Sequence, residues 1–306
     1  MTQVEITFLG TTAGVPTKYR NHASIYLRYQ SENEFFYLFD CGEGTQRQIF
    51  SAGLNFMRIS DIFISHWHAD HFAGLLGLMQ TMNLEHREKP LNIFGPEATK
   101  FVNILRSLGY SRLNYHVHTH DVDFESKEIS TLLEENEFIV QSIPAKHSIP
   151  AAAFAFVEKD RVKIDKDKIT KLGLPPRGKI YKDAKEKGHL TFRGREILLE
   201  EISTVEKGKK VVYSGDTLPT KNMIKLAEGA DLLIHDSTFF SEDFSEDEGY
   251  KHANFADVLK IAEEANVKEV ILTHISRRYQ DTSELKEKIA DRKNVRIAKD
   301  FMKVVL

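Results

Sequence analysis

The stretch His66-Trp67-His68-Ala69-Asp70-His71 decides the fold class and the chemistry of this 306-residue sequence. It follows the short apolar run Ile62-Phe63-Ile64 and precedes a helix-like stretch at 72–79. Imidazole and carboxylate groups are good ligands for zinc and similar divalent ions. One tetrahedral site seldom takes four ligands from a single loop, so the H-x-H-x-D-H spacing predicts two metal ions. The alternative is a polar surface loop in which these residues gather only by chance.

Three further polar residues obey the same rule, because each comes just after a short apolar run that reads as a strand. His147 follows 138–143, Asp216 follows 210–213, and His274 follows 269–272. Side chains at the ends of separate strands can converge on one edge of a sheet, the usual place for sites in α/β proteins. Taken alone, each could equally be a polar residue at the edge of the core. The predicted ligand set is His66, His68 and His147 for metal one, Asp70, His71 and His274 for metal two, and Asp216 as a bridge.

The coarse pattern of the chain is α/β, with successive strands early and alternating strands and helices late. The predicted strands are residues 4–9, 23–29, 35–40, 61–65, 91–94, 138–143, 153–157, 210–214, 231–234 and 269–273. The predicted helices are residues 44–52, 71–82, 96–108, 219–228, 254–265 and 283–290. Periodicity alone does not say how the sheets face each other.

Other motifs lie outside the ligand set. Residues 8–21 end in a P-x-K-x-R-N loop, 39–46 read F-D-C-G-E-G-T-Q, 273–279 read T-H-I-S-R-R-Y, and 298–301 read A-K-D-F. With S-G-D-T at 214–217, they resemble the ribonuclease Z family of the metallo-β-lactamase superfamily, endonucleases that trim tRNA 3′ ends. The hexapeptide alone indicates only the superfamily. One departure is His235-Asp236-Ser237-Thr238, where the family commonly has H-E-A-T.

The resemblance implies a metallo-β-lactamase-type four-layer αββα sandwich. It implies one domain over 1–306 with an inserted flexible arm at about 159–210. The implied activity is that of a zinc-dependent endoribonuclease, with two Zn²⁺ per chain, that removes the 3′ trailer from precursor tRNA. The tRNA would keep a 3′-hydroxyl and the trailer a 5′-phosphate, with a metal-bridging hydroxide as the nucleophile. The resemblance also implies a homodimer.

Three residues are expected to move protons. Asp70, as a ligand of metal two, is placed to orient the hydroxide and take its proton. His252 resembles the family's general acid, and Asp236 would orient it and raise its pKa. Without the resemblance, His252 would read as a surface or capping residue ahead of the helix at 254–265.

The segment from Lys159 to Lys210 is unusually basic. It holds 16 Lys and Arg against 9 Asp and Glu, a net charge of +7, whereas the whole chain carries −3. A charge run of this kind is commonly a solvated surface insertion. Here the G-L-P-P-R-G-K-I-Y stretch at 173–181 resembles the family's arm, which grips the tRNA elbow. A local basic lobe suits an anionic partner bound in one place.

Composition is that of an ordinary globular enzyme, with 41% hydrophobic and 28% charged residues. We expect no membrane span and no secretory signal. The single cysteine, Cys41, cannot form an internal disulfide, is expected in the core, and favours a cytoplasmic location. The H-V-H-T-H run at 116–120 reads as an exposed strand or loop, and His22 as a surface residue.

Two other functions stay open. A hydrolase of the same superfamily acting on a small thioester, lactone or phosphodiester would need neither the basic arm nor the R-N loop. A metal-binding RNA adaptor without catalysis is disfavoured, because the predicted ligand set has no obvious defect. A tRNA with a 3′ trailer, tested beside a thioester and bis-p-nitrophenyl phosphate, separates the three functions.

Overall fold

The computed structural model describes residues 2–108, 112–240, 251–279 and 283–306. The chain forms two compact units. The main unit is Met1–Val157 with Lys210–Leu306, and the arm unit is Glu158–Lys209. Each unit has its own hydrophobic core.

The first sheet of the main unit contains strands from the amino-terminal half of the chain and the last strand of the chain. Its strands are β1 (Gln3–Gly10), β3 (Ser24–Gln30), β4 (Glu34–Phe39), β5 (Asp61–Phe63), β6 (Leu91–Gly95), β7 (Val117–Asp121) and β20 (Lys303–Val305). They lie in the order β20-β1-β3-β4-β5-β6-β7. The strands from β4 to β7 are parallel, so their carboxyl ends meet at one edge of the sheet.

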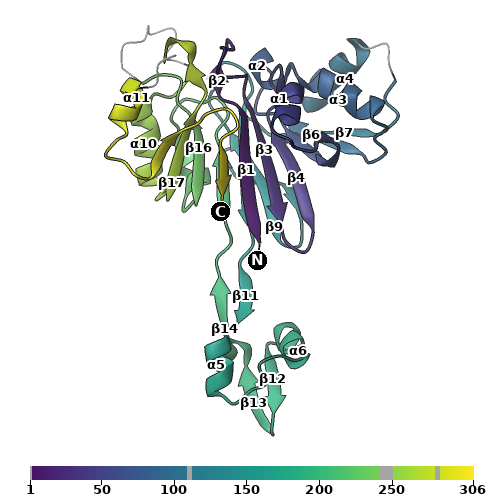
Figure 1. Cartoon of the computed structure of the whole chain (residues 1–306), viewed down its shortest axis with the longest axis vertical. Coiled ribbons are helices and arrows are strands. Elements are labelled where there is room, and N and C mark those ends of the chain that lie inside the picture. Colours follow the sequence, from purple (N-terminus) through teal and green to yellow (C-terminus); the bar gives the residue numbers. More distant parts are fainter. Residues whose placement is uncertain (1, 109–111, 241–250, 280–282) are drawn as a thin grey trace. The chain divides into compact units, whose positions relative to one another are not determined.

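The second sheet is built from the later part of the chain. Its strands are β8 (Ser130–Glu134), β9 (Phe138–Pro144), β10 (Ala152–Glu158), β15 (Lys210–Tyr213), β16 (Leu232–Asp236), β17 (Glu269–Thr273) and β19 (Val295–Ile297). Their order is β19-β17-β16-β15-β10-β9-β8, with β15, β16, β17 and β19 parallel. A short parallel pair, β2 (Thr12–Ala13) and β18 (Ile275–Ser276), lies next to the ends of these sheets (Figure 1).

Helices cover the outer faces of both sheets (Figure 1). On the first sheet these are α1 (Thr45–Ser51), α3 (Leu75–Leu84) and α4 (Ala98–Leu108), and on the second α8 (Lys221–Ala227), α10 (Phe255–Glu264) and α11 (Ser283–Lys288). Shorter elements are α2 (Ala69–Phe72) and the 3₁₀ turns η1 (Phe56–Arg58) and η2 (Arg277–Tyr279).

Three hydrophobic clusters separate four layers. The central cluster packs Tyr29 and Phe39 of the first sheet against Phe138 and Phe154 of the second. A second cluster lies between the first sheet and α1, α3 and α4, and a third between the second sheet and α8 and α10. Each fully buried Phe contributes about 1.5–3 kcal/mol. The predicted four-layer αββα sandwich is confirmed.

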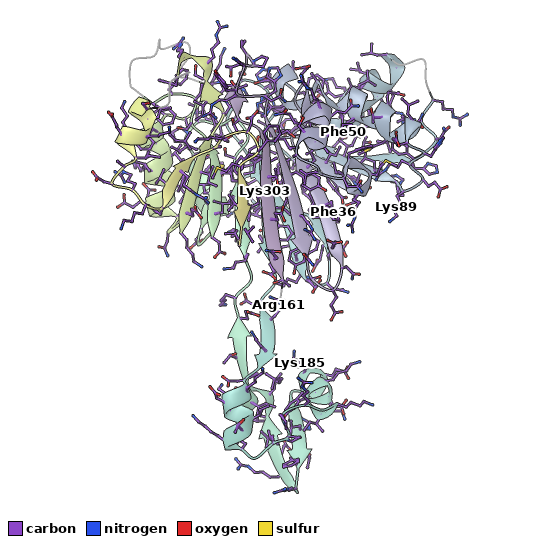
Figure 2. The ribbon with its side chains drawn as sticks, viewed as in Figure 1. Phe36, Phe50, Lys89, Arg161, Lys185 and Lys303 are labelled. Atoms are coloured by element: carbon purple, nitrogen blue, oxygen red, sulfur yellow. The ribbon has the colours of Figure 1, made fainter. Side chains whose placement is uncertain are left out.

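The arm unit is more structured than its sequence suggested. It contains β11 (Arg161–Ile164), α5 (Lys166–Lys171), α6 (Ile180–Lys187), β12 (His189–Phe192), β13 (Arg195–Leu198), α7 (Leu199–Ile202) and β14 (Ser203–Glu206). β11 pairs with β14, and β12 with β13. Tyr181, Leu190 and Ile197 belong to a small core of its own. Lys185 on α6 is exposed, as Figure 2 shows.

Several single-residue expectations can be compared with the structure. Cys41 is buried, and burial raises the pKa of its thiol to about 12, which confirms the core assignment. His118 and His120 lie exposed on the edge strand β7, and His116 lies exposed directly before it, as expected. The expectation for His22 was wrong, because its side chain is only 12% exposed. No helix in the described ranges has the length and apolar character that crossing a membrane requires.

Candidate metal centre and active site

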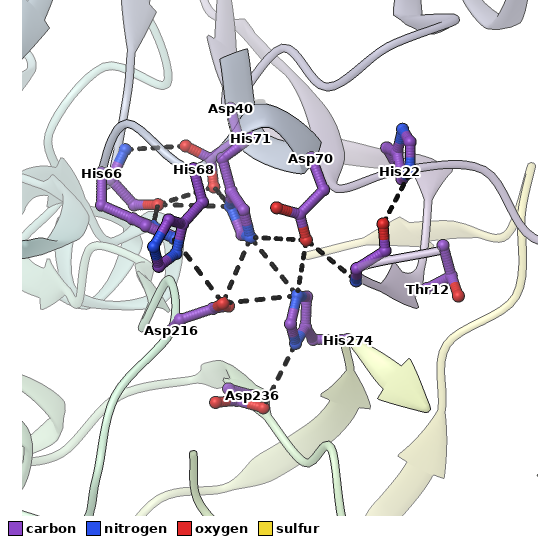
Figure 3. Close-up of polar contacts among 12 residues, drawn as sticks. Thr12, His22, Asp40, His66, His68, Asp70, His71, Asp216, Asp236 and His274 are labelled. Carbon is purple, nitrogen blue, oxygen red and sulfur yellow. Dashed lines mark hydrogen bonds and ion pairs between the residues drawn. The ribbon is translucent and has the colours of Figure 1, made fainter. Parts of the chain in front are cut away.

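The strand order positions the candidate ligands. His66 and His68 follow β5, His147 follows β9, Asp216 follows β15, and His274 follows β17. Asp70 and His71 lie in α2, whose first turn closes with a hydrogen bond from the His71 N–H to the His68 carbonyl oxygen at 2.9 Å. The structure therefore brings together residues that follow strands of both sheets, and Figure 3 shows most of them in one cluster.

The first predicted triad is compact. Nδ1 of His68 lies 3.0 Å from Nε2 of His66 and 3.1 Å from Nε2 of His147. The ligand atoms of the three histidines are close enough to hold one ion. Nδ1 of His147 lies 2.8 Å from the carbonyl oxygen of Lys251, which orients the ring.

The second predicted triad is equally compact. Oδ2 of Asp70 lies 3.6 Å from Nε2 of His71 and 3.4 Å from Nε2 of His274. The two imidazole Nε2 atoms are 3.3 Å apart. These three side chains also form a group able to hold one ion.

Asp216 lies between the two triads. Its Oδ2 atom is 3.7 Å from Nε2 of His66, 3.3 Å from Nε2 of His71 and 3.4 Å from Nε2 of His274. The structure thus brings all seven predicted ligands together. Figure 3 shows the carboxylate of Asp216 facing His66, His71 and His274. Among the residues that the structure describes, every cluster able to hold a metal belongs to this one site.

Burial and charge move the pKa values of the site histidines in opposite directions. Burial lowers the pKa of His66, His68 and His147, so these imidazoles are neutral, the form that binds a metal ion. Burial also opposes the charged forms of His71 and His274. Asp216 and its neighbouring carboxylates outweigh that effect, and the pKa of His274 rises to about 10.

The carboxylates stay ionised despite their burial. Burial by itself raises the pKa of Asp70 and Asp216, but His71 and His274 outweigh it, and both values fall below the usual range. An ionised pair of carboxylates among imidazoles is a donor set that a cation can bridge.

Asp40 belongs to the candidate site by its contacts, and the search for ligands missed it. It lies directly after β4, is fully buried, and has a φ of 57°. Its Oδ2 atom lies 2.7 Å from Nδ1 of His71 and accepts hydrogen bonds from Ser65 Oγ at 2.8 Å and Tyr213 at 2.6 Å. A carboxylate behind a metal-ligating histidine fixes the ring and its tautomer. The strand-end rule would have found Asp40, because it too follows an apolar strand.

His252 also lies near Asp216, with its Nδ1 atom 3.7 Å from Oδ2 of that residue, and it is oriented by Asp236. Its Nδ1 atom is 3.0 Å from Oδ2 of Asp236. Burial lowers the pKa of His252, but Asp236 outweighs this effect, and the net shift is upward. The aspartate at this position therefore reaches the histidine directly. Asp216, Asp236, His252 and His274 are also close enough to form a metal-compatible group.

A cavity of about 520 Å³ borders the cluster. Its lining includes the backbone turn at Gly14 and Val15 and the basic side chains of Lys251, Arg277 and Arg278. Cations around a cavity that ends at a metal-compatible cluster suit a substrate with negative charge.

The fold and the ligand cluster define a hydrolase of the metallo-β-lactamase fold. Residues 201–275 match the family model described as Beta-lactamase superfamily domain, and residues 4–168 match the model of the anti-Pycsar protein Apyc1. Among solved structures, the short form of human tRNase Z is similar with a TM-score of 0.69 and 27% identity, covering 98% of each chain. YhfI from Bacillus subtilis shares the fold at a TM-score of 0.68 and 19% identity, covering 100% of each chain.

Curated relatives narrow the class. Ribonuclease Z from Methanothermobacter thermautotrophicus is 41% identical over 291 residues, which span 93% of this chain and 90% of that protein. Ribonuclease Z from Methanosarcina acetivorans is 36% identical over 306 residues, spanning 98% and 97%. The chain belongs to the ribonuclease Z family of metal-dependent endoribonucleases.

Proposed function

We propose that this protein removes the 3′ trailer from precursor tRNA, leaving a 3′-hydroxyl on the tRNA and a 5′-phosphate on the trailer. The observation that carries the proposal is the convergence of seven metal ligands beside a cavity with basic lining, in a chain of the ribonuclease Z family. A metal-dependent attack on a phosphodiester needs these two features together.

We propose two zinc ions per chain. His66, His68 and His147 would hold one, Asp70, His71 and His274 the other, and Asp216 would contact both. The donor set fits, because imidazoles and ionised carboxylates are ligands that zinc accepts, and a bound ion would take the place of the protons that the carboxylates favour on His71 and His274. When bound, divalent ions supply a nucleophile near neutral pH and offset the charge that develops on the phosphoryl group.

The chain's own residues would perform the proton transfers. The carboxylate of Asp70 lies beside Nε2 of His71 and of His274, and can orient the attacking water and take its proton. His252 can protonate the leaving oxygen of the tRNA. Asp236 binds its Nδ1 side, so Nε2 is the ring nitrogen left for the substrate.

The arm unit is proposed as a second contact with tRNA. Lys182, Lys185 and Lys187 lie exposed on α6, within the basic segment. None of the proposed metal ligands lies in this unit. Contacts with the tRNA backbone would raise affinity for many tRNAs alike, since phosphates carry no sequence information.

A homodimer and a cytoplasmic location remain predictions from the resemblance and the composition. Phe50 on α1 is 56% exposed and is an apolar side chain that a second copy could cover (Figure 2). Sedimentation equilibrium tests the dimer directly, since a single species at the mass of one chain contradicts it.

One assay tests the activity. The metal-loaded protein is incubated with a precursor tRNA that carries a 3′ trailer, with a thioester, and with bis-p-nitrophenyl phosphate. Cleavage of the precursor to a tRNA with a free 3′-hydroxyl and a trailer with a 5′-phosphate supports the proposal. Turnover of only the small substrates favours the alternative, a hydrolase of small thioesters, lactones or phosphodiesters. Binding of the RNA without any cleavage favours an RNA adaptor.

A further inference from the structure

The loop after β1 makes a chain of contacts that ends on the ligand Asp70. The main-chain N–H of Gly14 donates a hydrogen bond to Oδ2 of Asp70 at 2.9 Å. The carbonyl oxygen of the same glycine lies 3.1 Å from Nε2 of His22. Figure 3 shows these contacts beside the ligand cluster.

The hydrogen bond from Gly14 reaches the oxygen of Asp70 that faces the site. The same Oδ2 atom lies 3.4 Å from Nε2 of His274 and 3.6 Å from Nε2 of His71. A hydrogen bond to an ionised carboxylate is among the stronger ones and fixes the direction of the group. The Gly14 N–H therefore restrains the oxygen that would meet both an ion and the attacking water.

The position of Gly14 favours glycine because of its backbone conformation. A side chain there would not clash with a neighbour. Its φ is +58°, in the left-handed region, and a Cβ built there would meet nothing within 4 Å. Glycine and asparagine adopt this conformation far more readily than β-branched residues do. The left-handed turn presents the N–H to Asp70 and the C=O to His22 from one residue.

His22 holds that turn through the contact of its Nε2 atom with the carbonyl oxygen of Gly14. Its ring is 12% exposed, and its side chain packs against Gly42, where a Cβ would lie 2.5 Å from the Cβ of His22 and 2.2 Å from the carbonyl oxygen of Asp70. Since the carbonyl oxygen of Gly14 can only accept, Nε2 of His22 carries the hydrogen. Its Nδ1 atom is 3.9 Å from Oε2 of Glu43, beyond hydrogen-bond distance.

We propose that Gly14 and His22 are positioning residues, which hold the carboxylate of Asp70 in the orientation needed to bind metal and to accept a proton. This inference deepens the proposed function and rests on its metal assignment, in which Asp70 is a ligand and takes a proton. It assigns a purpose to a loop that contributes no ligand of its own.

The first test compares His22→Ala with His22→Gln. Glutamine keeps a side-chain N–H donor, whereas alanine removes it. Metal affinity is measured by competition with a chelator, and kcat with bis-p-nitrophenyl phosphate. We expect His22→Ala to weaken metal binding on the order of 10-fold, the lower end of the range for groups that support metal ligands. His22→Gln should recover most of the loss. Equal metal affinity and kcat in wild type and His22→Ala would overturn the role of His22.

The second test compares Gly14→Val with Gly14→Asn and remains decisive if the His22 variants do not fold. Gly53 supplies the matched control, because its φ is +67°, a Cβ there also meets nothing within 4 Å, and it lies after α1, away from the ligand cluster. We expect Gly14→Val to weaken metal binding and lower kcat, and Gly14→Asn to stay near wild type. Gly53→Val should lower the Tm alone.

The outcomes separate this inference from the proposed function. A lower Tm with unchanged metal affinity in Gly14→Val, as in Gly53→Val, would overturn the positioning role. Weaker metal binding in Gly14→Val supports it even if wild-type protein cleaves no precursor tRNA, and in that case only the proposed function fails.

Discussion

Nδ1 of His252 lies 3.0 Å from Oδ2 of Asp236, and the Asp236 carboxylate is fully buried. The other carboxylate oxygen accepts hydrogen bonds from the N–H and Oγ1 of Thr238, at 3.0 and 2.6 Å. Because a carboxylate can only accept, Nδ1 of His252 carries a hydrogen and the ring direction is fixed. This arrangement is suited to a histidine that donates a proton from Nε2.

His252→Ala should lower kcat for precursor tRNA by roughly 10²–10⁴-fold, the range for loss of a general acid. The p-nitrophenolate leaving group of bis-p-nitrophenyl phosphate needs little protonation, so kcat on that substrate should fall much less. Steady-state kinetics on both substrates measure the difference. Equal losses on the two substrates would contradict the acid role.

Metal content distinguishes a general-acid role of His252 from a metal-ligand role. Asp216, Asp236, His252 and His274 form a metal-compatible group, so His252 could instead be a ligand. If it is the acid, His252→Ala keeps the metal content of wild type. His118→Ala, an exposed histidine on β7, is the control for histidine removal as such.

Asp216→Ala should lose most activity and bind metal less tightly, because it removes the carboxylate that lies within 3.7 Å of His66 and 3.4 Å of His274. Wild-type protein should contain close to two divalent ions per chain. Elemental analysis by mass spectrometry measures the metal content of wild type and of Asp216→Ala, and so checks both the metal count and the loss of metal. A single ion in fully active enzyme would refute the two-metal assignment.

Asp40→Asn should weaken metal binding by about 10–100-fold, the usual cost of removing the carboxylate behind a metal-ligating histidine. The reason is the 2.7 Å contact of Asp40 with Nδ1 of His71. Asp61→Asn is the matched control, because Asp61 is also a buried aspartate of the first sheet but hydrogen-bonds to Asn92 and not to a ligand. Chelator competition on both variants is the measurement. Similar affinities in the two would argue against the role of Asp40.

Local sequence signals predicted most of the residues that converge at the candidate site, because these residues stand at or near strand ends. The hexapeptide, His147, Asp216 and His274 each follow a recognisable apolar run, and parallel strands bring such ends together. Tyr213 and His22 could not be found this way. Tyr213 reaches Asp40 from the opposite sheet, 173 residues away in sequence. His22 acts through the backbone of Gly14, and no residue pattern encodes that contact.

Asp300 gives a prediction about pH. Thr11 Oγ1 and the N–H of Asn21 donate hydrogen bonds to it, at 2.8 and 2.7 Å. Burial outweighs these contacts and raises the pKa of Asp300 to about 6. Since the unfolded value is about 3.9, the folded state binds more protons between those two pH values. The stability from this group is full below about pH 4 and is lost as pH rises through about 6.

Asp300→Asn removes this titration. The free energy of unfolding, measured with urea from pH 4 to pH 7, should fall with pH more steeply in wild type than in the variant. The amide can shift the whole curve by a constant amount, so the slope difference is the readout. Parallel curves would mean that Asp300 titrates alike in folded and unfolded protein.

The arm unit can be removed as a whole, because the residues directly before and after it are paired with each other. Val157 of β10 and Lys210 of β15 are paired residues on adjacent antiparallel strands, so an Asn-Gly turn can replace residues 158–209. The arm has its own small core, whereas the main unit retains all the proposed ligands. Deleting only part of the arm would expose Leu190 and Ile197, so the complete excision is the cleaner variant.

The excision should raise KM for precursor tRNA and flatten its dependence on salt, because fewer phosphate contacts release fewer counterions. Turnover of bis-p-nitrophenyl phosphate should survive, since that substrate needs only the metal centre.

A second variant, Lys182→Gln with Lys185→Gln and Lys187→Gln, leaves the fold of the arm intact and removes exposed charge from α6. It should show the same two effects in weaker form. If the arm is a structural insertion, excision harms both substrates together or neither, and the three glutamines change nothing. Kinetics on both substrates from about 50 to 200 mM salt, with metal content matched to wild type, distinguish the two roles.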